Sequence, residues 1–440
     1  MPRMEWAKLL SQKRIGKKEQ DTSSSNGRTM FESDVDRIIF SGAFRRLSRK
    51  TQVHPLAPND HIHNRLTHSL EVARVGAALG QAIGRLLSKK NALPENIKPA
   101  DIGTIVHAAC LAHDIGNPPF GHAGESAIKN WFMSEGPAVL SKSALDAPHK
   151  DDLYHYEGNA QGFRIITQTE NHLFNGGLRL TAATLGTFLK YPWTINQNRN
   201  KFGSFLSEAN MLKTVANETG LIKKPDKGWS RHPLAFLVEA DDDICYGILD
   251  LEDGVELRII SFDEVFDVLT TCFENEKKER IKATFAPPDA YRINLSRLRG
   301  EIFDELIAAA IVAFETMYEE IMAGQLTGDL FGALPNYDPR RHIAQSASAL
   351  SNRKIYGDAK KVEIELGSSS TFSHLLGTFC NAALRCSAHL SDPDRTVVDW
   401  KSKLVLRLLG DHSPLVAKRA DGENWNDYQC IRRVLDFVGA

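Results

Sequence analysis

Apolar residues recur at intervals of three and four along most of the chain, which is the spacing of an amphipathic helix. The clearest runs span residues 34–49, 67–87, 101–112, 233–251 and 298–321. Residues 362–366 instead alternate Val, Ile and Leu with Glu, and this period of two predicts a strand in a small hairpin. The pattern therefore predicts an all-α fold with a minor β-hairpin.

The order of these runs indicates one large domain. Residues 1–30 contain a Ser-, Asn- and Gly-rich stretch at 21–27, and we expect them to form a flexible N-terminal segment. No later stretch has the composition of a linker, so residues 31–440 are expected to form a single large helical domain. A chain of 440 residues is long enough to bury a large core.

Composition excludes some classes of protein. Lys and Arg number 54 against 55 Asp and Glu, which argues against a globally basic nucleic-acid binder. A local basic run at Arg45, Arg46, Arg49 and Lys50 is interpreted as a solvated face; a nucleic-acid, effector or subunit surface is the alternative. Six cysteines without a CxxC pair indicate reduced thiols of a cytoplasmic protein. No run of about 18 apolar residues predicts a membrane span.

Candidate metal ligands stand at three places, namely His68, the pair His113-Asp114, and the acidic run Asp241–Asp243. Imidazole and carboxylate together suit one divalent cation, such as Mn, Fe, Co, Ni or Zn, and less well Mg. The alternative is that the pair arose by chance among 15 histidines and that the acidic run is a solvated helix end.

The context of the His-Asp pair favours the metal hypothesis. The pair follows the predicted helix 101–112, and Gly116 and the Pro118-Pro119 dipeptide then break the helix. The two side chains therefore leave a buried helix at a rigid turn, which is a suitable place for ligands.

In six segments, with the His-Asp turn among them, the chain resembles the HD-domain deoxynucleoside triphosphate triphosphohydrolases, the bacterial dGTPase-like family. The matching segments are Arg37–Leu47, Lys50–Val53, Asn64–Val72, His113–Glu125, Glu157–Gln161 and His232–Tyr246. The resemblance covers at least residues 34–255 and is weaker beyond residue 270. One departure is Asp241, where such proteins commonly have Ala.

The resemblance implies an HD-domain helical fold, with the metal core in about 34–255 and a C-terminal helical part in about 256–440. It also implies a reaction, in which water attacks the α-phosphorus of a dNTP to give deoxynucleoside and inorganic triphosphate. It assigns one divalent metal ion to four ligands, His68, His113, Asp114 and Asp242. Asp242 is chosen from the acidic run because the resemblance aligns it with the ligand-bearing segment.

Two further residues share a helical face with Asp242. Tyr246 and Asp250 follow it at i+4 and i+8. The resemblance implies that both lie near the deoxyribose, where a tight fit excludes a 2′-hydroxyl.

His122 and Glu125 are the candidate catalytic pair. They are three residues apart, so on one helix they share a face, and His122 can donate a proton to the leaving oxygen while Glu125 holds its tautomer or charge. The alternative is a helix start at which Glu125 only supplies favourable first-turn charge.

The remaining candidates would bind substrate. Arg65, one turn before His68, can reach a metal-bound phosphate, and Gln52 can bond the sugar 3′-hydroxyl or the base. Asn117, Asn159 and Lys201 complete the predicted substrate-binding set.

Two other functions compete with the dNTP hydrolase. One is an HD phosphodiesterase acting on another nucleotide, and the other is a nucleic-acid-responsive regulatory binding protein. Two-metal members of the wider group need additional His ligands, and Asn117 stands where one could have been, which favours a single metal. The resemblance also implies a homo-oligomer, with a hexamer expected, and single-stranded DNA or an effector nucleotide as further partners.

Overall fold

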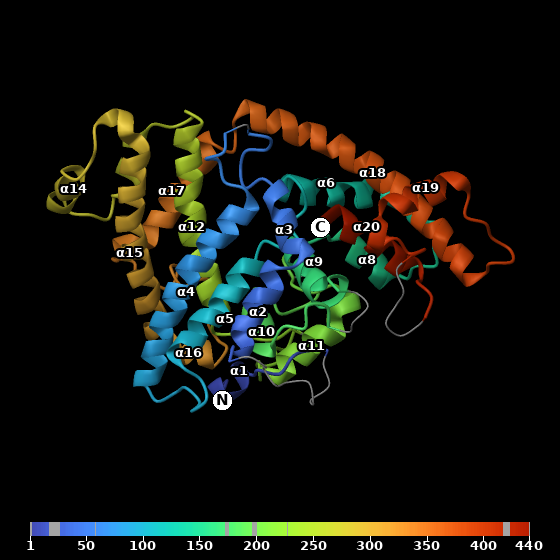
Figure 1. Ribbon diagram of the computed structural model, residues 1–440, viewed down its shortest axis with the longest axis horizontal. Coiled ribbons are helices and arrows are strands. Elements are labelled where there is room, and N and C mark those ends of the chain that lie inside the picture. Colours follow the sequence, from blue (N-terminus) through green and yellow to red (C-terminus); the bar gives the residue numbers. More distant parts are fainter. Residues whose placement is uncertain are drawn as a thin grey trace.

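The computed structural model describes residues 2–16, 27–57, 59–171, 176–195, 200–226, 228–416 and 423–439. In these residues the fold is helical, and β-structure is limited to four isolated bridges (Figure 1). The all-α prediction is confirmed. No helix of the described residues is both long and apolar enough to cross a membrane.

The expected hairpin at 362–366 is wrong, because these residues lie in the long helix α18 (Ala359–Ser391). Asp358 caps the start of that helix by accepting hydrogen bonds from the backbone N–H groups of Lys360 and Lys361. Further along, Phe372 and Leu376 are buried in the core. Packing of the whole helix therefore overrides the short alternating pattern.

Three helices, α4 (Arg65–Lys89), α5 (Pro99–Ala112) and α12 (Ala235–Glu256), form the middle of the first of two hydrophobic cores and pack against one another (Figure 1). Glycines allow α4 and α5 to approach closely, since a Cβ on Gly80 would lie 3.0 Å from the Cα of Gly103. This packing brings together the start of α4, the end of α5 and the middle of α12. The sequence periodicity locates all three helices.

The other helices around this first core include α1 (Trp6–Leu9), α2 (Met30–Ile39), α10 (Ala182–Phe188), α15 (Tyr291–Thr316) and α17 (Ile343–Lys354). The helix expected over 34–49 is divided into α2, α3 (Gly42–Arg46) and the 3₁₀ turn η2 (Leu47–Arg49). The break lies at Ser41, whose Oγ accepts a hydrogen bond from Phe44 N and so begins a new helix.

The N-terminal residues are more ordered than expected. Trp6 and Leu9 are buried in the first core, and Arg14 is buried with its guanidinium 2.6 Å from the carboxylate of Asp34. The expectation of a flexible segment 1–30 is therefore wrong for residues 2–16, while residues 17–26 lie outside the described residues.

A second core lies beside the first and joins distant parts of the chain. It contains α6 (Gly121–Ser134), α8 (Ala147–Tyr154), α19 (Trp400–Leu408), α20 (Asp427–Gly439) and the C-terminal half of α18. The C-terminal part thus divides, with α13 to α17 on the first core and α18 to α20 on the second.

The remaining helices are α7 (Gly136–Leu140), α9 (Gly158–Arg164), the π-helix η3 (Ile165–Thr169), η4 (Leu206–Glu208), α11 (Ala209–Glu218), α13 (Phe262–Leu269), α14 (Asn275–Lys282), η5 (Pro288–Ala290), α16 (Tyr318–Met322), η6 (Pro339–His342) and η7 (Gly410–His412).

Candidate active site

The four predicted metal ligands meet where α4, α5 and α12 converge. The ligand atoms of His68, His113 and Asp114 lie within 4.8 Å of one another. Asp242 faces this group from α12, with Oδ1 3.1 Å from His68 Nε2 and 3.5 Å from His113 Nε2. The arrangement can hold one metal ion.

Hydrogen bonds to neighbouring groups orient these ligands. His113 Nδ1 donates to the carbonyl oxygen of Cys110 at 2.6 Å, which turns Nε2 towards the other ligands as the atom that would bind a metal. Asp114 Oδ1 accepts hydrogen bonds from Arg65 at 2.5 Å and from the Asn117 side chain at 2.7 Å. Within the described residues, His113 Nε2 and Asp114 Oδ2 are buried without a hydrogen-bond partner. Free, oriented nitrogen and oxygen atoms of this kind fit a divalent cation.

Charges within the cluster are strongly coupled. Burial lowers the pKa of His113, but the carboxylates of Asp114 and Asp242 outweigh it and raise that pKa to about 9. Burial raises the pKa of Asp242, yet His113 and His68 hold it well below its usual range. Burial raises the pKa of Asp114 too, but Arg65, His113 and His68 outweigh it and lower that pKa, so both carboxylates are charged at neutral pH, which favours a cation between them.

The turn after Asp114 folds the chain back towards the same cavity. Gly116 has a φ of +102°, and Phe120, at the start of α6, has a φ of +64°. A Cβ on Gly116 would lie 2.1 Å from the backbone nitrogen of Gly162 in α9, so only glycine fits there. We call residues 113–121 the metal turn.

The cluster opens into a cavity of about 720 Å³, a volume within the range of small-ligand sites. Of the predicted site residues, all but His68 and Asp250 line it. His68 is buried in the floor, and Asp250 is buried behind a tyrosine.

His122 and Glu125 both line the cavity but do not form the expected pair. His122 is exposed at the start of α6. Glu125 is 4% exposed, and its Oε1 accepts a hydrogen bond from Gly158 N at 2.7 Å. Glu125 thus holds the start of α9, and the described residues contain no hydrogen bond between it and His122.

Nitrogen donors follow one wall of the cavity from the metal cluster outwards. Beyond Arg65 and Asn117, the side chain of Asn159 donates to Glu157 at 2.7 Å. Lys201 Nζ lies 3.0 Å from Glu157 and 3.6 Å from Glu125, and its side chain is 40% exposed. This ammonium is available to an anionic ligand.

The opposite wall contains a residue that the sequence analysis missed. Tyr356, which follows α17, forms hydrogen bonds through its hydroxyl to Tyr246 and to Asp250. The rings of the two tyrosines are 6.2 Å apart. Burial raises the pKa of Asp250 to about 8. Through its hydrogen bond, Asp250 fixes the position of Tyr356, which lines the cavity. Gln52 lines the same cavity, and its buried side-chain oxygen has no hydrogen-bond partner among the described residues.

Comparison with known proteins agrees with this geometry. The family model described as "HD domain" matches residues 65–174, which include every predicted ligand except Asp242. A deoxyguanosinetriphosphate triphosphohydrolase-like protein of Pseudomonas aeruginosa is 43% identical over 442 residues, covering 99% of this chain and 95% of the relative. The chain belongs to the deoxyguanosinetriphosphate triphosphohydrolase-like family.

Other members of this dGTPase-like family are also similar to the chain. A protein of Synechocystis with the same name is 38% identical over 402 residues, or 87% of each chain. A protein of Yersinia enterocolitica named deoxyguanosinetriphosphate triphosphohydrolase is 36% identical over 300 residues, covering 59% of this chain and 56% of the relative. The resemblance inferred from the motifs is confirmed.

Proposed function

We propose that this protein is a metal-dependent triphosphohydrolase that cleaves a dNTP, such as dGTP, into deoxynucleoside and inorganic triphosphate. The observation that carries the proposal is the convergence of four oriented ligands on one cavity whose walls also hold His122, Arg65 and Lys201. Family membership supports it, since the relatives are named triphosphohydrolases or triphosphohydrolase-like proteins.

His68, His113, Asp114 and Asp242 would hold the cation. A divalent ion bound there would neutralise phosphate charge and lower the pKa of a water molecule. Its identity among Mg, Mn, Co, Ni, Fe and Zn is open, because mixed imidazole and carboxylate ligands accept all of them.

The protein side chains would supply the remaining steps. Arg65 and Lys201 bind phosphate oxygens and hold the α-phosphorus near the metal cluster, with Asn117 and Asn159 as further donors. The water oxygen bonds to the α-phosphorus and releases a proton to the solvent, the bond from phosphorus to O5′ breaks, and His122 donates a proton to O5′. Glu125 contributes by fixing α9 rather than by contact with His122.

The sugar would lie against Tyr246 and Tyr356. An aromatic wall at C2′ leaves no room or partner for a ribose hydroxyl, which selects deoxyribose. Gln52, with its free buried oxygen, would accept a hydrogen bond from the 3′-hydroxyl or the base. Asp250 would act on substrate through Tyr356, which it holds in place.

Three further proposals rest on the sequence, the first on its six cysteines without a CxxC pair and the other two on the family resemblance. They are a cytoplasmic location, a homo-hexameric assembly, and activation by single-stranded DNA or an effector nucleotide. Light scattering of the purified protein tests the assembly, and dGTP turnover with and without each nucleic acid or nucleotide tests the activation.

Product analysis tests the proposed function. The four dNTPs are incubated with protein loaded with Mg, Mn or Co, and the products are separated by ion-exchange chromatography. We expect deoxynucleoside and triphosphate in equal amounts, and none with a His113→Ala variant of normal helical content. Release of a nucleoside monophosphate supports a phosphodiesterase instead, and no turnover of any nucleotide supports a binding protein.

A further inference from the structure

Lys50 is a buried ammonium at the junction of three segments. It is 5% exposed, and its Nζ donates to the carbonyl oxygens of Asn117 at 2.6 Å and of Gly439 at 3.0 Å. Asn117 belongs to the metal turn, and Gly439 is in the last turn of α20. The carbonyl of Lys50 itself accepts a hydrogen bond at 2.9 Å from the backbone N–H of Arg65, at the start of α4.

A second contact joins α20 to the metal turn. The hydroxyl of Tyr156 donates to the carbonyl oxygen of Gly116 at 3.2 Å. A Cβ on Gly439 would lie 2.2 Å from that hydroxyl, so the end of α20 is in contact with the tyrosine. Two separate side chains, Lys50 and Tyr156, therefore connect the C-terminal helix to the residues that follow Asp114.

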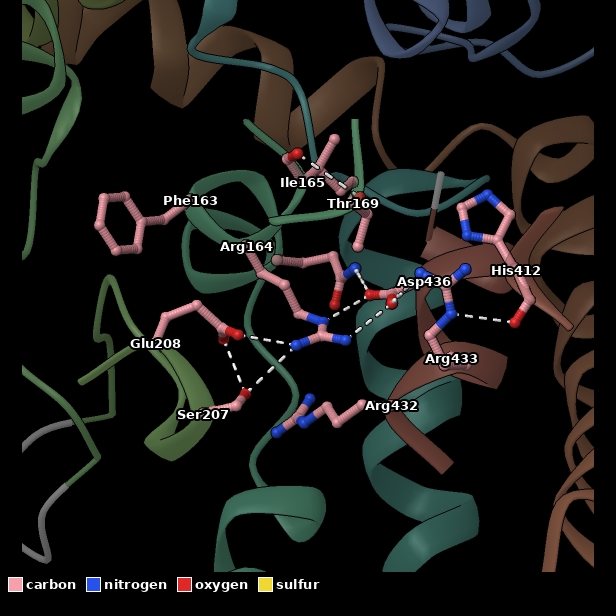
Figure 2. Close-up of polar contacts among 12 residues, drawn as sticks. Phe163, Arg164, Ile165, Thr169, Ser207, Glu208, His412, Arg432, Arg433 and Asp436 are labelled. Atoms are coloured by element: carbon pink, nitrogen blue, oxygen red, sulfur yellow. Dashed lines mark hydrogen bonds and ion pairs between the residues drawn. The ribbon is translucent and has the colours of Figure 1, made fainter. Parts of the chain in front are cut away.

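Buried charges fix where α20 lies (Figure 2). Asp436 accepts hydrogen bonds from Arg164 at 2.7 and 2.8 Å and from Gln161 at 2.9 Å, both in α9. Arg432, on the same helix, is fully buried and pairs with Asp152 of α8. Such pairs tolerate little displacement, because separation leaves a buried charge without its partner. The carbonyl of Gly439 is consequently held in one place.

The surroundings of Lys50 explain why carbonyl groups are its partners. Carbonyls at the C-terminal end of a helix carry partial negative charge and favour a nearby cation. Burial, together with the charges of Arg65 and Arg46, lowers the pKa of Lys50 to about 7. The hydrogen bonds to the carbonyls of Asn117 and Gly439 therefore offset part of the cost of burying this amino group.

We propose that Lys50 is a positioning residue for the metal site. Its ammonium holds the backbone of Asn117, whose side chain orients Asp114, and it uses the end of α20 as a second anchor. The last helix of the fold thereby sets the geometry of the ligands. The catalytic consequence rests on the proposed function, whereas the effect on metal affinity does not.

The affinity for Mn²⁺ tests this role in the variant Lys50→Met, which keeps most of the length of the side chain without its hydrogen-bond donors. Mn²⁺ binding is followed by electron paramagnetic resonance of the free ion, and kcat and KM are measured with dGTP. We expect the Kd for Mn²⁺ to rise roughly 10–100-fold, as for other groups that orient ligands, and kcat to fall more than KM rises.

Lys224→Met is the matched control, because Lys224 also donates to a backbone carbonyl, that of Gly324, but away from the metal turn and α20. At a temperature where it is folded, its Kd for Mn²⁺ should stay within about twofold of wild type. Gly439→Ala, which forces the helix end off Tyr156, provides a second variant if Lys50→Met does not fold, and we expect it to weaken Mn²⁺ binding in the same direction.

The inference is overturned if the folded Lys50 or Gly439 variant binds Mn²⁺ as tightly as wild type, or if its binding is weakened no more than in Lys224→Met. A wild-type protein that binds Mn²⁺ but releases no triphosphate contradicts the proposed function and leaves the comparison of affinities intact.

Discussion

Replacing Gly116 with alanine should disrupt the metal turn from within. The added Cβ would lie 2.1 Å from Gly162 N and 2.4 Å from Gly158 O, both backbone atoms of α9 that cannot rotate away. A φ of +102° at this position adds strain of about 1–2 kcal/mol for a residue with a side chain. Overpacking of a fixed core adds about 1–3 kcal/mol. We therefore expect the free energy of unfolding to fall by about 2–5 kcal/mol.

Gly300→Ala is the matched control, because Gly300 lies in α15 with nothing within 4 Å of its added Cβ. That change should stabilise the protein by about 0.5–1 kcal/mol. Both variants are unfolded in urea with EDTA present, and Mn²⁺ affinity is measured separately. Gly116→Ala should lose affinity as well as stability, because the turn must move away from α9. Wild-type stability and affinity in Gly116→Ala would refute the argument that the backbone contact with α9 shapes the metal turn.

Three other predictions follow from the site and the core. His122→Ala should keep Mn²⁺ and dGTP binding but lower kcat by roughly 10²–10⁴-fold, because a general acid is lost. Weak dGTP binding with normal turnover of bound dGTP, measured by pre-steady-state kinetics, would argue against that role. Tyr246→Ala should relax the preference for dGTP over GTP, measured as the ratio of kcat/KM, because the sugar wall is lost; equal use of both by the wild type would contradict the wall. His232 is fully buried, with Nε2 donating to Leu9 O and Nδ1 accepting from Leu234 N, and burial lowers its pKa to about 4. Between about pH 6.5 and pH 4 the unfolded chain takes up a proton that the folded chain does not, so the free energy of unfolding should fall by up to about 3 kcal/mol as the pH is lowered. In urea unfolding across that range, the free energy of unfolding should depend less on pH in His232→Gln than in the wild type. The same pH dependence in both proteins would exclude this histidine as a cause.

The parts of the fold that follow local rules were predictable. The repeat of apolar residues located α4, α5 and α12, since α4 buries one face in the first core and α5 and α12 are buried there over most of their surface. The His-Asp pair at the end of α5 and its Pro-Pro turn pointed to ligands, and the geometry brings His68 and Asp242 to the same point.

The errors arose where distant contacts decide the outcome. Residues 362–366 alternate like a strand, but they lie in a helix whose later residues pack into the second core. Glu125 has the spacing to contact His122, yet its side chain turns to the N–H of Gly158, a residue 33 positions away. Tyr356 had no local signal, because only the packing of α17 and α12 brings it beside Tyr246.

The most direct test of the central claim is to hydrolyse dGTP in H₂¹⁸O with metal-loaded protein and to locate the label by mass spectrometry. Attack of water on the α-phosphorus predicts one ¹⁸O atom in the inorganic triphosphate and none in the deoxynucleoside. Label in the deoxynucleoside, or release of deoxynucleoside monophosphate with pyrophosphate, would contradict the account.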